Sequence, residues 1–296
     1  MIGYLAAEGF EEELARELGA PHERHGRLFL APGPERSAAW AANVWRTPVR
    51  LEVRSIADAA AQLRALQRNW ALYSARDHRR AALIDARLPH VSAKPIAPFS
   101  PLPAAPLGSF TLLDRDTVLA SADCASPFPH GEVRFVEDHE GPPSRAYLKL
   151  WELFTLSGRW PAPGERVVDL GAAPGGWTWV LASLGCRVLS VDKAPLDPRV
   201  AALPNVEHRT QSAFALDPAE VGPIDWLFSD VICYPKRLLG LVERWLAAGN
   251  VRNFACTIKF QGETDHETAT RFAAIEGARL RHLSHNRHEL TWTRLA

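Results

Sequence analysis

The stretch VVDLGAAPGGWTWVLASLG, residues 167–185, decides the fold of the second half of the chain. A short apolar run ends near Asp169, three glycines follow, and an apolar helix-like segment begins at Trp177. Glycine is used where φ must be positive or where a side chain would block a ligand. In an open α/β sheet, ligands bind at such strand-to-helix turns, beyond the carboxyl ends of the strands. The stretch therefore predicts a strand, a ligand-binding turn and a helix.

The spacing within the turn indicates which ligand it binds. It reads D-x-G-A-x-P-G-G-W from Asp169 to Trp177, not G-x-G-x-x-G. A dinucleotide turn presents helix N–H groups to a pyrophosphate, and Pro174 removes one of those donors. The next apolar segment ends at Asp192, where an acid is expected to accept hydrogen bonds from ribose hydroxyls. The pattern favours a nucleoside without phosphates, such as S-adenosylmethionine; the alternative is an ordinary tight turn.

Composition sets wider limits on what the protein does. The 296 residues are 47% hydrophobic and 23% charged, with a formal net charge of zero. This balance is typical of a globular protein and argues against a strongly basic nucleic-acid binder, although not against a local basic patch. No apolar run reaches membrane-spanning length, and the N-terminus lacks a basic signal-peptide region. The four cysteines are scattered, which predicts reduced thiols in a cytoplasmic protein and no metal site.

The chain divides into two regions by pattern. Strands and helices alternate from residue 141 onward, which predicts an α/β domain over residues 141–296, with a mostly parallel sheet and helices on both faces. Residues 1–140 are predicted to form a smaller α+β region. A proline-rich stretch within it, residues 89–108, is expected to be an extended connector.

Within the first region we expect several local elements. Strands are predicted over Ile2–Ala7, Arg27–Ala31 and Val49–Ser55, and a hairpin turn at Asp114–Asp116. The segment Ile56–Trp70 has helical periodicity. It is predicted to be one helix with Leu63, Leu66 and Trp70 on a single face.

The second region resembles a known family. DLGAAPGGWTW is similar to the cofactor loop of the FtsJ-like ribose 2′-O-methyltransferases, and the segments SRAYLKLWELF, WLFSDVICYPKR, FACTIKFQG and HNRHELTW continue the resemblance. They place Lys149, Asp230, Lys259 and Glu289 at the family's Lys–Asp–Lys–Glu tetrad. The resemblance implies a Rossmann-like methyltransferase domain, S-adenosylmethionine as cofactor and no metal. The turn and the resemblance together assign cofactor binding to Asp169, Gly171, Ala172, Pro174, Gly175, Gly176, Trp177, Asp192, Ser212 and Asp230.

The resemblance also bears on the adenine site and on the substrate. Relatives tend to carry an acid after the third strand, where this chain has Gln211 and Ser212, and either side chain can hydrogen-bond adenine. The segments GFEEELARELG, VRLEVRS and RHELTW look most like the branch that methylates a cytidine ribose of 23S ribosomal RNA. That branch carries a longer N-terminal RNA-binding region with a THUMP module. Residues 1–140 are therefore expected to be an abbreviated THUMP-like module that positions RNA.

The tetrad fits the chemistry of methyl transfer to a hydroxyl. A ribose hydroxyl is a poor nucleophile, so the enzyme has to weaken its hold on one proton and align the attack. Burial and a neighbouring ammonium both favour the neutral form of a lysine. Lys259 is therefore expected to act as the base, with Lys149 and Asp230 as its electrostatic partners. Glu289 is expected to orient Lys149 or the ribose.

Other function classes and weaker signals remain open from the sequence. A small-molecule methyltransferase suits the neutral charge, and a noncatalytic RNA-binding or ribosome-assembly factor retains the same fold. Basic clusters at residues 75–81, 235–237 and 279–288 either contact RNA phosphates or form solvated faces. Tyr234 either stacks on a flipped base or packs in the core. Three histidines recur at intervals of three within residues 282–288; on a strand they cannot all face one way, so we do not expect them to form a metal site.

Overall fold

A computed structural model describes residues 1–19 and 23–296 of the chain. The described chain separates into two compact units, Met1–Val136 and Glu137–Ala296. The sequence predicts a boundary near residue 141.

The first unit begins with a four-stranded sheet in the order β2-β3-β1-β4. Its strands are β1 (Ile2–Ala6), β2 (Glu23–His25), β3 (Leu28–Ala31) and β4 (Ala41–Trp45), with helix α1 (Glu11–Leu18) after β1. β1 pairs antiparallel with both β3 and β4. Helix α1 has acids in its first turn and Arg16 in its last, as the helix dipole favours. The predicted strands at residues 2–7 and 27–31 are confirmed.

A second four-stranded sheet in this unit has the order β5-β8-β7-β6. Its strands are β5 (Val49–Glu52), β6 (Trp70–Leu72), β7 (Gly108–Leu112) and β8 (Thr117–Ser121), and its helices are α2 (Ile56–Leu66) and α3 (His78–Asp85). β7 and β8 form the predicted hairpin around Asp114–Asp116. The first unit is therefore an α+β region with mainly antiparallel sheets, as predicted.

The helix predicted over Ile56–Trp70 is too long. It ends at Leu66 because Gln67 adopts an extended backbone, and the chain then enters β6, which pairs parallel with β7. Leu63 is buried as expected, whereas Leu66 is 47% exposed and Trp70 lies in the strand. The Trp70 ring is buried all the same, and its Nε1 donates to the carbonyl of Leu63 at 3.0 Å. The prediction of one apolar face was wrong because the third member belongs to a sheet.

The proline-rich stretch at residues 89–108 is fully described and contains no helix; β7 begins at its last residue, Gly108. Its other ordered pairing is a single bridge between Ile96 and Phe135. A single 3₁₀ turn, Pro129–Gly131, follows later in the unit. The missing proline N–H groups explain why no ladder forms here.

The second unit is built on a seven-stranded sheet in the order β11-β10-β9-β12-β13-β15-β14. The strands are β9 (Arg166–Leu170), β10 (Arg187–Asp192), β11 (Val206–Thr210), β12 (Ile224–Ser229), β13 (Val251–Lys259), β14 (Ala278–Arg281) and β15 (Glu289–Arg294). Pairs among the first five strands of this order are parallel, and β15 runs antiparallel to both of its neighbours. The prediction of a mostly parallel sheet is confirmed.

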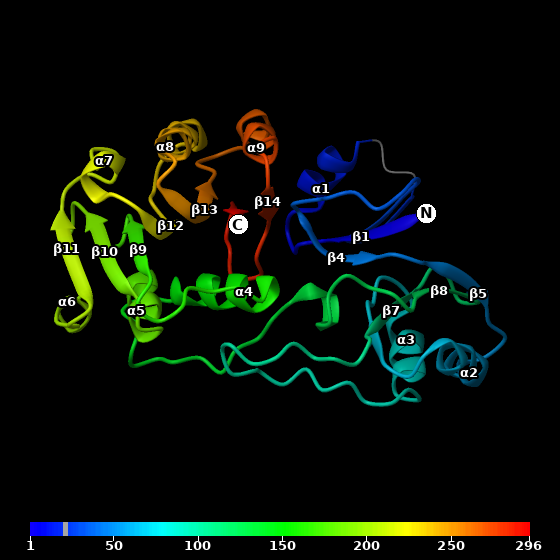
Figure 1. Ribbon diagram of the computed structural model, residues 1–296. Coiled ribbons are helices and arrows are strands. Elements are labelled where there is room, and N and C mark those ends of the chain that lie inside the picture. The colour runs from blue at the N-terminus through cyan, green and yellow to red at the C-terminus, as the bar shows by residue number, and fades with distance from the viewer. Residues whose placement is uncertain (20–22) are drawn as a thin grey trace. The chain divides into compact units, whose positions relative to one another are not determined.

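Helices cover both faces of this sheet. They are α4 (Tyr147–Ser157), α5 (Gly176–Ser183), α6 (Pro198–Ala201), α7 (Pro218–Val221), α8 (Pro235–Ala248) and α9 (His266–Ala273). In Figure 1, α7, α8 and α9 lie above the strands, and α4, α5 and α6 lie below them. Apolar side chains of both layers fill the core, for example Phe154 of α4 against Phe228 of β12. No helix in the described part of the chain has both the length and the apolar character needed to cross a membrane.

Candidate active site

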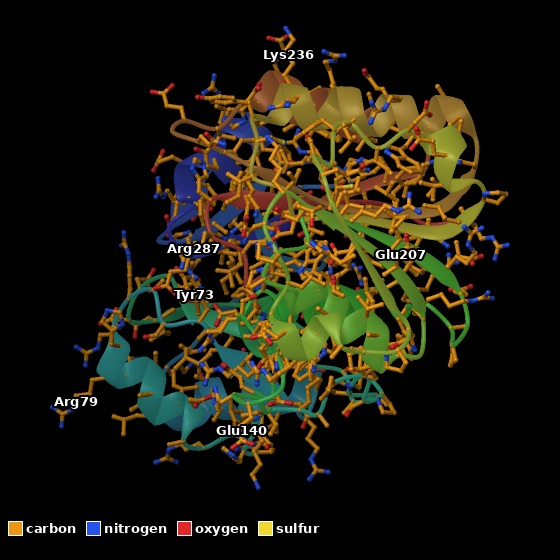
Figure 2. The ribbon with its side chains drawn as sticks, turned by 90° about the vertical axis from the view of Figure 1, so that its left-hand side faces the viewer. Tyr73, Arg79, Glu140, Glu207, Lys236 and Arg287 are labelled. Atoms are coloured by element: carbon orange, nitrogen blue, oxygen red, sulfur yellow. The ribbon has the colours of Figure 1, made fainter. Side chains whose placement is uncertain are left out.

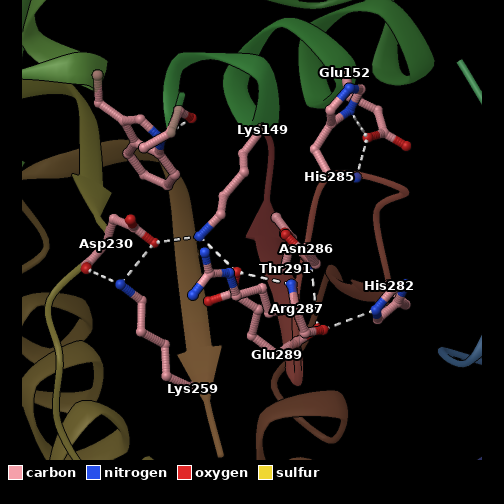
Figure 3. A network of polar contacts seen from close by, with 12 residues as sticks. Lys149, Glu152, Asp230, Lys259, His282, His285, Asn286, Arg287, Glu289 and Thr291 are labelled. Atoms are coloured by element: carbon pink, nitrogen blue, oxygen red, sulfur yellow. Dashed lines mark hydrogen bonds and ion pairs between the residues drawn. The ribbon is translucent and has the colours of Figure 1, made fainter. Parts of the chain in front are cut away.

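Four side chains from distant parts of the sequence form one polar network at the carboxyl ends of the inner strands β12 and β13 (Figure 3). The Lys149 ammonium contacts Glu289 Oε1 at 2.6 Å and Asp230 Oδ1 at 3.2 Å. Lys259 Nζ also contacts Asp230 Oδ1 at 3.2 Å and donates to the Asp230 carbonyl at 2.5 Å. The four side chains are between 7% and 18% exposed. The structure thus brings together all four residues of the predicted tetrad.

Strand order and register explain this meeting. Asp230 directly follows β12, and Lys259 ends the neighbouring parallel strand β13. β15 runs antiparallel to β13, and its first residue, Glu289, lies directly opposite Lys259. Lys149 lies in the first turn of α4, which packs against α5 beside the sheet. The ends of two strands, the start of a third and one helix therefore converge.

The charges of the network balance. Two ammonium groups face two carboxylates in a nearly buried place, where an unpaired charge is strongly unfavourable. Lys149 bridges both carboxylates, whereas Lys259 contacts one. Lys259 also donates to the Asp230 carbonyl, so each ammonium uses two of its three N–H donors within the network and keeps one for a group outside it.

A pocket of about 390 Å³ lies between the glycine turn and the tetrad. This volume falls within the range of small-molecule sites. Lys259, Asp230 and Asp192 all line it. Its remaining lining residues are Ser144, Ala146, Asp169, Gly171, Ala172, Ala173, Pro174, Gly176, Trp177, Val231 and Ile232. Most of the predicted cofactor residues therefore share one cavity with the predicted base.

The backbone of the turn explains its glycines. Gly171 has φ of +78°, and a Cβ there would lie 2.6 Å from Val231 Cα. Gly175 has φ of +114°, a conformation that residues with side chains rarely adopt. At Gly176 a Cβ would approach Ser144 Oγ to 2.5 Å. The turn therefore needs glycine at residues 171 and 175 because of their backbone conformation, and at residue 171 also because the Val231 backbone lies close; the Ser144 hydroxyl beside Gly176 can rotate away.

We expect Gly171→Ala to destabilise the protein more than Gly164→Ala does. Both glycines have a similar positive φ, +78° and +83°, but a Cβ at Gly164 meets no atom within 4 Å. In the Gly164 variant the free energy of unfolding should fall by about 1–2 kcal/mol, which is the cost of that backbone conformation for alanine. The Gly171 variant should lose roughly 1–3 kcal/mol more, because the wall at Val231 has to move. Denaturant unfolding of the two variants measures the difference, and equal losses would contradict the steric argument.

The other predicted cofactor residues take different places. The Asp192 carboxylate accepts hydrogen bonds from the N–H groups of Ala173 at 3.1 Å and Ala194 at 2.9 Å, which fixes it at the pocket. Trp177 is buried and donates from Nε1 to the Ala146 carbonyl at 2.9 Å, which connects the turn to the start of α4. Ser212 does not line the pocket, and its hydroxyl accepts from the Phe214 N–H at 3.3 Å.

Asp169 is a fully buried carboxylate in the floor of the pocket. Its Oδ2 accepts from the Thr178 hydroxyl at 2.7 Å, and its Oδ1 has no hydrogen-bond partner among the described residues. Burial raises the pKa of Asp169 to about 7, and the negative charges of Asp230 and Asp192 add to this effect. The unpartnered oxygen leaves an acceptor available to a donor or a cation bound in the pocket.

The raised pKa of Asp169 predicts a pH dependence of stability. An unfolded aspartate has a pKa of about 3.9, so this group's contribution to stability is fully present below that pH and is lost as pH rises through about 7. Between pH 5 and 8 the free energy of unfolding of Asp169→Asn should therefore rise relative to the unchanged protein, by about 2–3 kcal/mol. Urea unfolding at both pH values measures this difference, in which other titrating groups cancel. Parallel pH profiles would rule it out.

The three histidines of the β14–β15 connection each have a different partner. His282 Nε2 contacts the Arg287 carbonyl at 3.0 Å, His285 Nδ1 contacts Glu152 Oε2 at 2.6 Å, and His288 Nε2 contacts the Thr264 hydroxyl at 2.7 Å. Over residues 1–19 and 23–296 we find no group of three or more metal-binding side chains arranged to hold a metal ion.

The basic clusters are largely exposed. Figure 2 shows Arg79 of α3 and Lys236 of α8 each extending away from its own helix. Arg237 lies over the Phe214 ring at 3.9 Å. Tyr234, 66% exposed, does not pack in the core, which removes one of the two interpretations of this residue.

Sequence reasoning missed one buried acid beside the tetrad. Glu152 lies one turn after Lys149 on α4 and is 1% exposed. It accepts from the N–H groups of Ser284 at 2.8 Å and His285 at 3.0 Å, in addition to its contact with the His285 ring. A signal was present, because an acid within the apolar run YLKLWELF is unusual unless it is paired.

The fold and this pocket define a class of protein, and comparison with known proteins agrees. Residues 142–240 match the FtsJ-like methyltransferase family. The second unit thus contains an FtsJ-like methyltransferase domain, with a Rossmann-like fold.

Particular relatives extend this assignment. A ribosomal RNA large subunit methyltransferase M from Marinobacter nauticus is 34% identical over 200 residues, which cover 61% of this chain and 55% of the relative. The protein of the same name from Xanthomonas oryzae pv. oryzae is 39% identical over 168 residues, which cover 54% of this chain and 48% of that relative. The chain therefore spans about half the length of the curated relatives it matches. The expected resemblance to the large-subunit ribosomal RNA branch is confirmed.

Proposed function

We propose that this protein transfers a methyl group from S-adenosylmethionine to a ribose 2′-hydroxyl of RNA, and that its target is a cytidine of 23S ribosomal RNA. The observation that carries the proposal is the Lys149–Asp230–Lys259–Glu289 network beside a pocket of suitable size. Such a substrate implies work in the cytoplasm, and the free thiols at all four cysteines agree with this.

The pocket residues suit a cofactor that is a nucleoside with a cationic sulfur. Asp192 offers carboxylate oxygens for ribose hydroxyls, and the glycine turn lets the ligand approach the backbone. Asp169, which also lines the cavity, has one buried carboxylate oxygen without a hydrogen-bond partner among the described residues. S-adenosylmethionine supplies the activated methyl group. We assign adenine contact to the segment near Ser212, which remains a prediction.

The tetrad divides the remaining work. Lys259 lines the pocket and, as a neutral amine, would take the proton of the ribose hydroxyl as the oxygen bonds to the methyl carbon and the methyl–sulfur bond breaks, with its electron pair going to sulfur. Lys149, held between two carboxylates, fixes Asp230, which in turn orients Lys259. Glu289 completes the charge balance. Alignment of the hydroxyl contributes to the rate as well, since orientation can supply about 7–11 kcal/mol.

The first unit is assigned the task of positioning RNA. All tetrad and pocket residues lie in the second unit, and the first contributes exposed cations such as Arg79. We interpret it as an abbreviated THUMP-like module that binds the substrate through phosphate contacts.

The test is methyl transfer from labelled S-adenosylmethionine to ribosomal RNA isolated from a strain that lacks this gene. Label is expected in large-subunit RNA, at one nucleotide. The phosphodiester bond next to that nucleotide should resist alkaline hydrolysis, which locates the methyl group on the 2′-oxygen. A matched reaction with RNA from the unmodified strain should incorporate little label. Label on a base, or on no RNA at all, would overturn the proposal.

A further inference from the structure

The connection between β14 and β15, residues 282–288, is anchored to α4 by a buried acid (Figure 3). The Glu152 carboxylate accepts two backbone N–H groups, from Ser284 and His285, and contacts the His285 ring as well. A buried carboxylate is unfavourable without such donors, so these contacts strongly favour one conformation of the connection.

The anchored connection holds the backbone of Arg287 next to the tetrad. The Arg287 N–H donates to Glu289 Oε1 at 3.2 Å, and its carbonyl accepts from His282 Nε2 at 3.0 Å. The preceding residue, Asn286, is buried, and its Nδ2 donates to the Glu289 carbonyl at 3.2 Å and to the Thr291 hydroxyl at 3.1 Å. Hydrogen bonds of its own N–H and carbonyl groups, and those of the preceding Asn286 side chain, thus hold the backbone of residue 287 in place.

The side chain of Arg287 is in a different situation. It is exposed, and its guanidinium has no hydrogen bond or ion pair with any residue from 1–19 or 23–296. The two nearby carboxylates, of Asp230 and Glu289, are already engaged by lysines. In Figure 3 the Arg287 side chain turns toward the side on which Lys149 and Asp230 lie. The site therefore presents one positive charge that the protein itself does not neutralise.

The chemistry of the proposed substrate supplies a partner for that charge. In an RNA strand, a 2′-hydroxyl lies beside the phosphate on the neighbouring 3′-oxygen. A guanidinium forms paired, charge-assisted hydrogen bonds to phosphate oxygens. Resting on the proposed function, we propose that Arg287 binds the RNA phosphate next to the target ribose and that Glu152 is its positioning residue.

Arg279, a second cation of the same basic cluster, does not fit this role. Arg279 lies opposite Thr293, four residues along β15 from Glu289, which is roughly 13 Å away at the rise of a strand. It is exposed as Arg287 is, and it belongs to the same charged segment. Arg279 is therefore a matched control for the effect of position.

The experiment compares the KM for RNA, turnover and salt dependence among Arg287→Ala, Arg287→Lys and Arg279→Ala. We expect Arg287→Ala to raise the KM about tenfold, with a smaller change in turnover at saturating RNA. The slope of log affinity against log salt should fall by about 0.7–0.9, the loss of one phosphate contact. Lysine at 287 should restore the slope but only part of the affinity, because it lacks the paired donors. Arg279→Ala should keep a near-normal KM and salt slope, and all three variants should keep a near-normal affinity for the cofactor.

The positioning role of Glu152 has its own readout. Glu152→Gln should reproduce the weaker salt dependence of Arg287→Ala, and the double variant should be no worse for RNA than Arg287→Ala alone. The outcomes separate the two proposals. If the unchanged enzyme methylates RNA but Arg287→Ala keeps its KM and salt slope, or if Arg279→Ala loses as much, the inference about Arg287 is wrong. If the unchanged enzyme methylates no RNA, the proposed function itself fails.

Discussion

Replacement of Lys259 by alanine is expected to lower turnover by about 100- to 10,000-fold while cofactor affinity stays near normal. Removal of a general base typically costs this much. Lys259 lines the pocket, whereas Lys149 does not, so Lys259 is the lysine placed to reach the ribose hydroxyl. Single-turnover methylation of RNA at saturating cofactor measures the chemical step, and calorimetry measures cofactor binding.

Two further measurements distinguish a base from a mere ion-pair partner. Arginine at position 259 keeps the positive charge but is not deprotonated at working pH, so it should not restore turnover. Small primary amines added to Lys259→Ala should restore part of the rate, in proportion to their unprotonated fraction. Near-normal turnover of Lys259→Ala on its RNA would refute the base assignment, and full activity of Lys259→Arg would reassign the residue to charge stabilisation.

The local elements of the second unit were predictable because their signals are local. The glycine turn, the strands that end at Asp192 and Lys259, and the helix after Trp177 all follow from apolar runs and backbone requirements within a few residues. The wrong prediction that the helix extends to Trp70 has a cause that is not local. Its burial results from a parallel pairing with β7, almost forty residues away in sequence, which no helical periodicity reveals.

The candidate site was predictable in its residue types but not in its connections. The family resemblance named Lys149 and Glu289, yet their 2.6 Å contact depends on the position of α4 and on the antiparallel register of β15. Glu152 stayed unnoticed for the same reason. Its contacts with Ser284 and His285 reach across more than 130 residues, and they exist only once the sheet is assembled.

Lys149→Met is expected to lower the free energy of unfolding by about 3–5 kcal/mol, because breaking a buried ion pair leaves uncompensated charge. The ammonium of Lys149 contacts both carboxylates of the network, and without it the Glu289 carboxylate keeps a backbone donor, the Arg287 N–H, but no charged partner among the described residues. Denaturant unfolding measures the loss. Lys193→Met, which removes an exposed lysine beyond β10, is the control and should change stability by less than about 0.5 kcal/mol.

A double variant separates the structural role of Lys149 from its proposed catalytic role. In Lys149→Met with Glu289→Gln the unpaired carboxylate is gone, so much of the lost stability should return, with a coupling energy of roughly 1–3 kcal/mol. Turnover should not return, since the charge that fixes Asp230 and thereby Lys259 is still absent. Recovery of methylation together with stability would mean that Lys149 only supports the fold. Additive losses in the double variant would mean that the contact between Lys149 and Glu289 contributes little to the network.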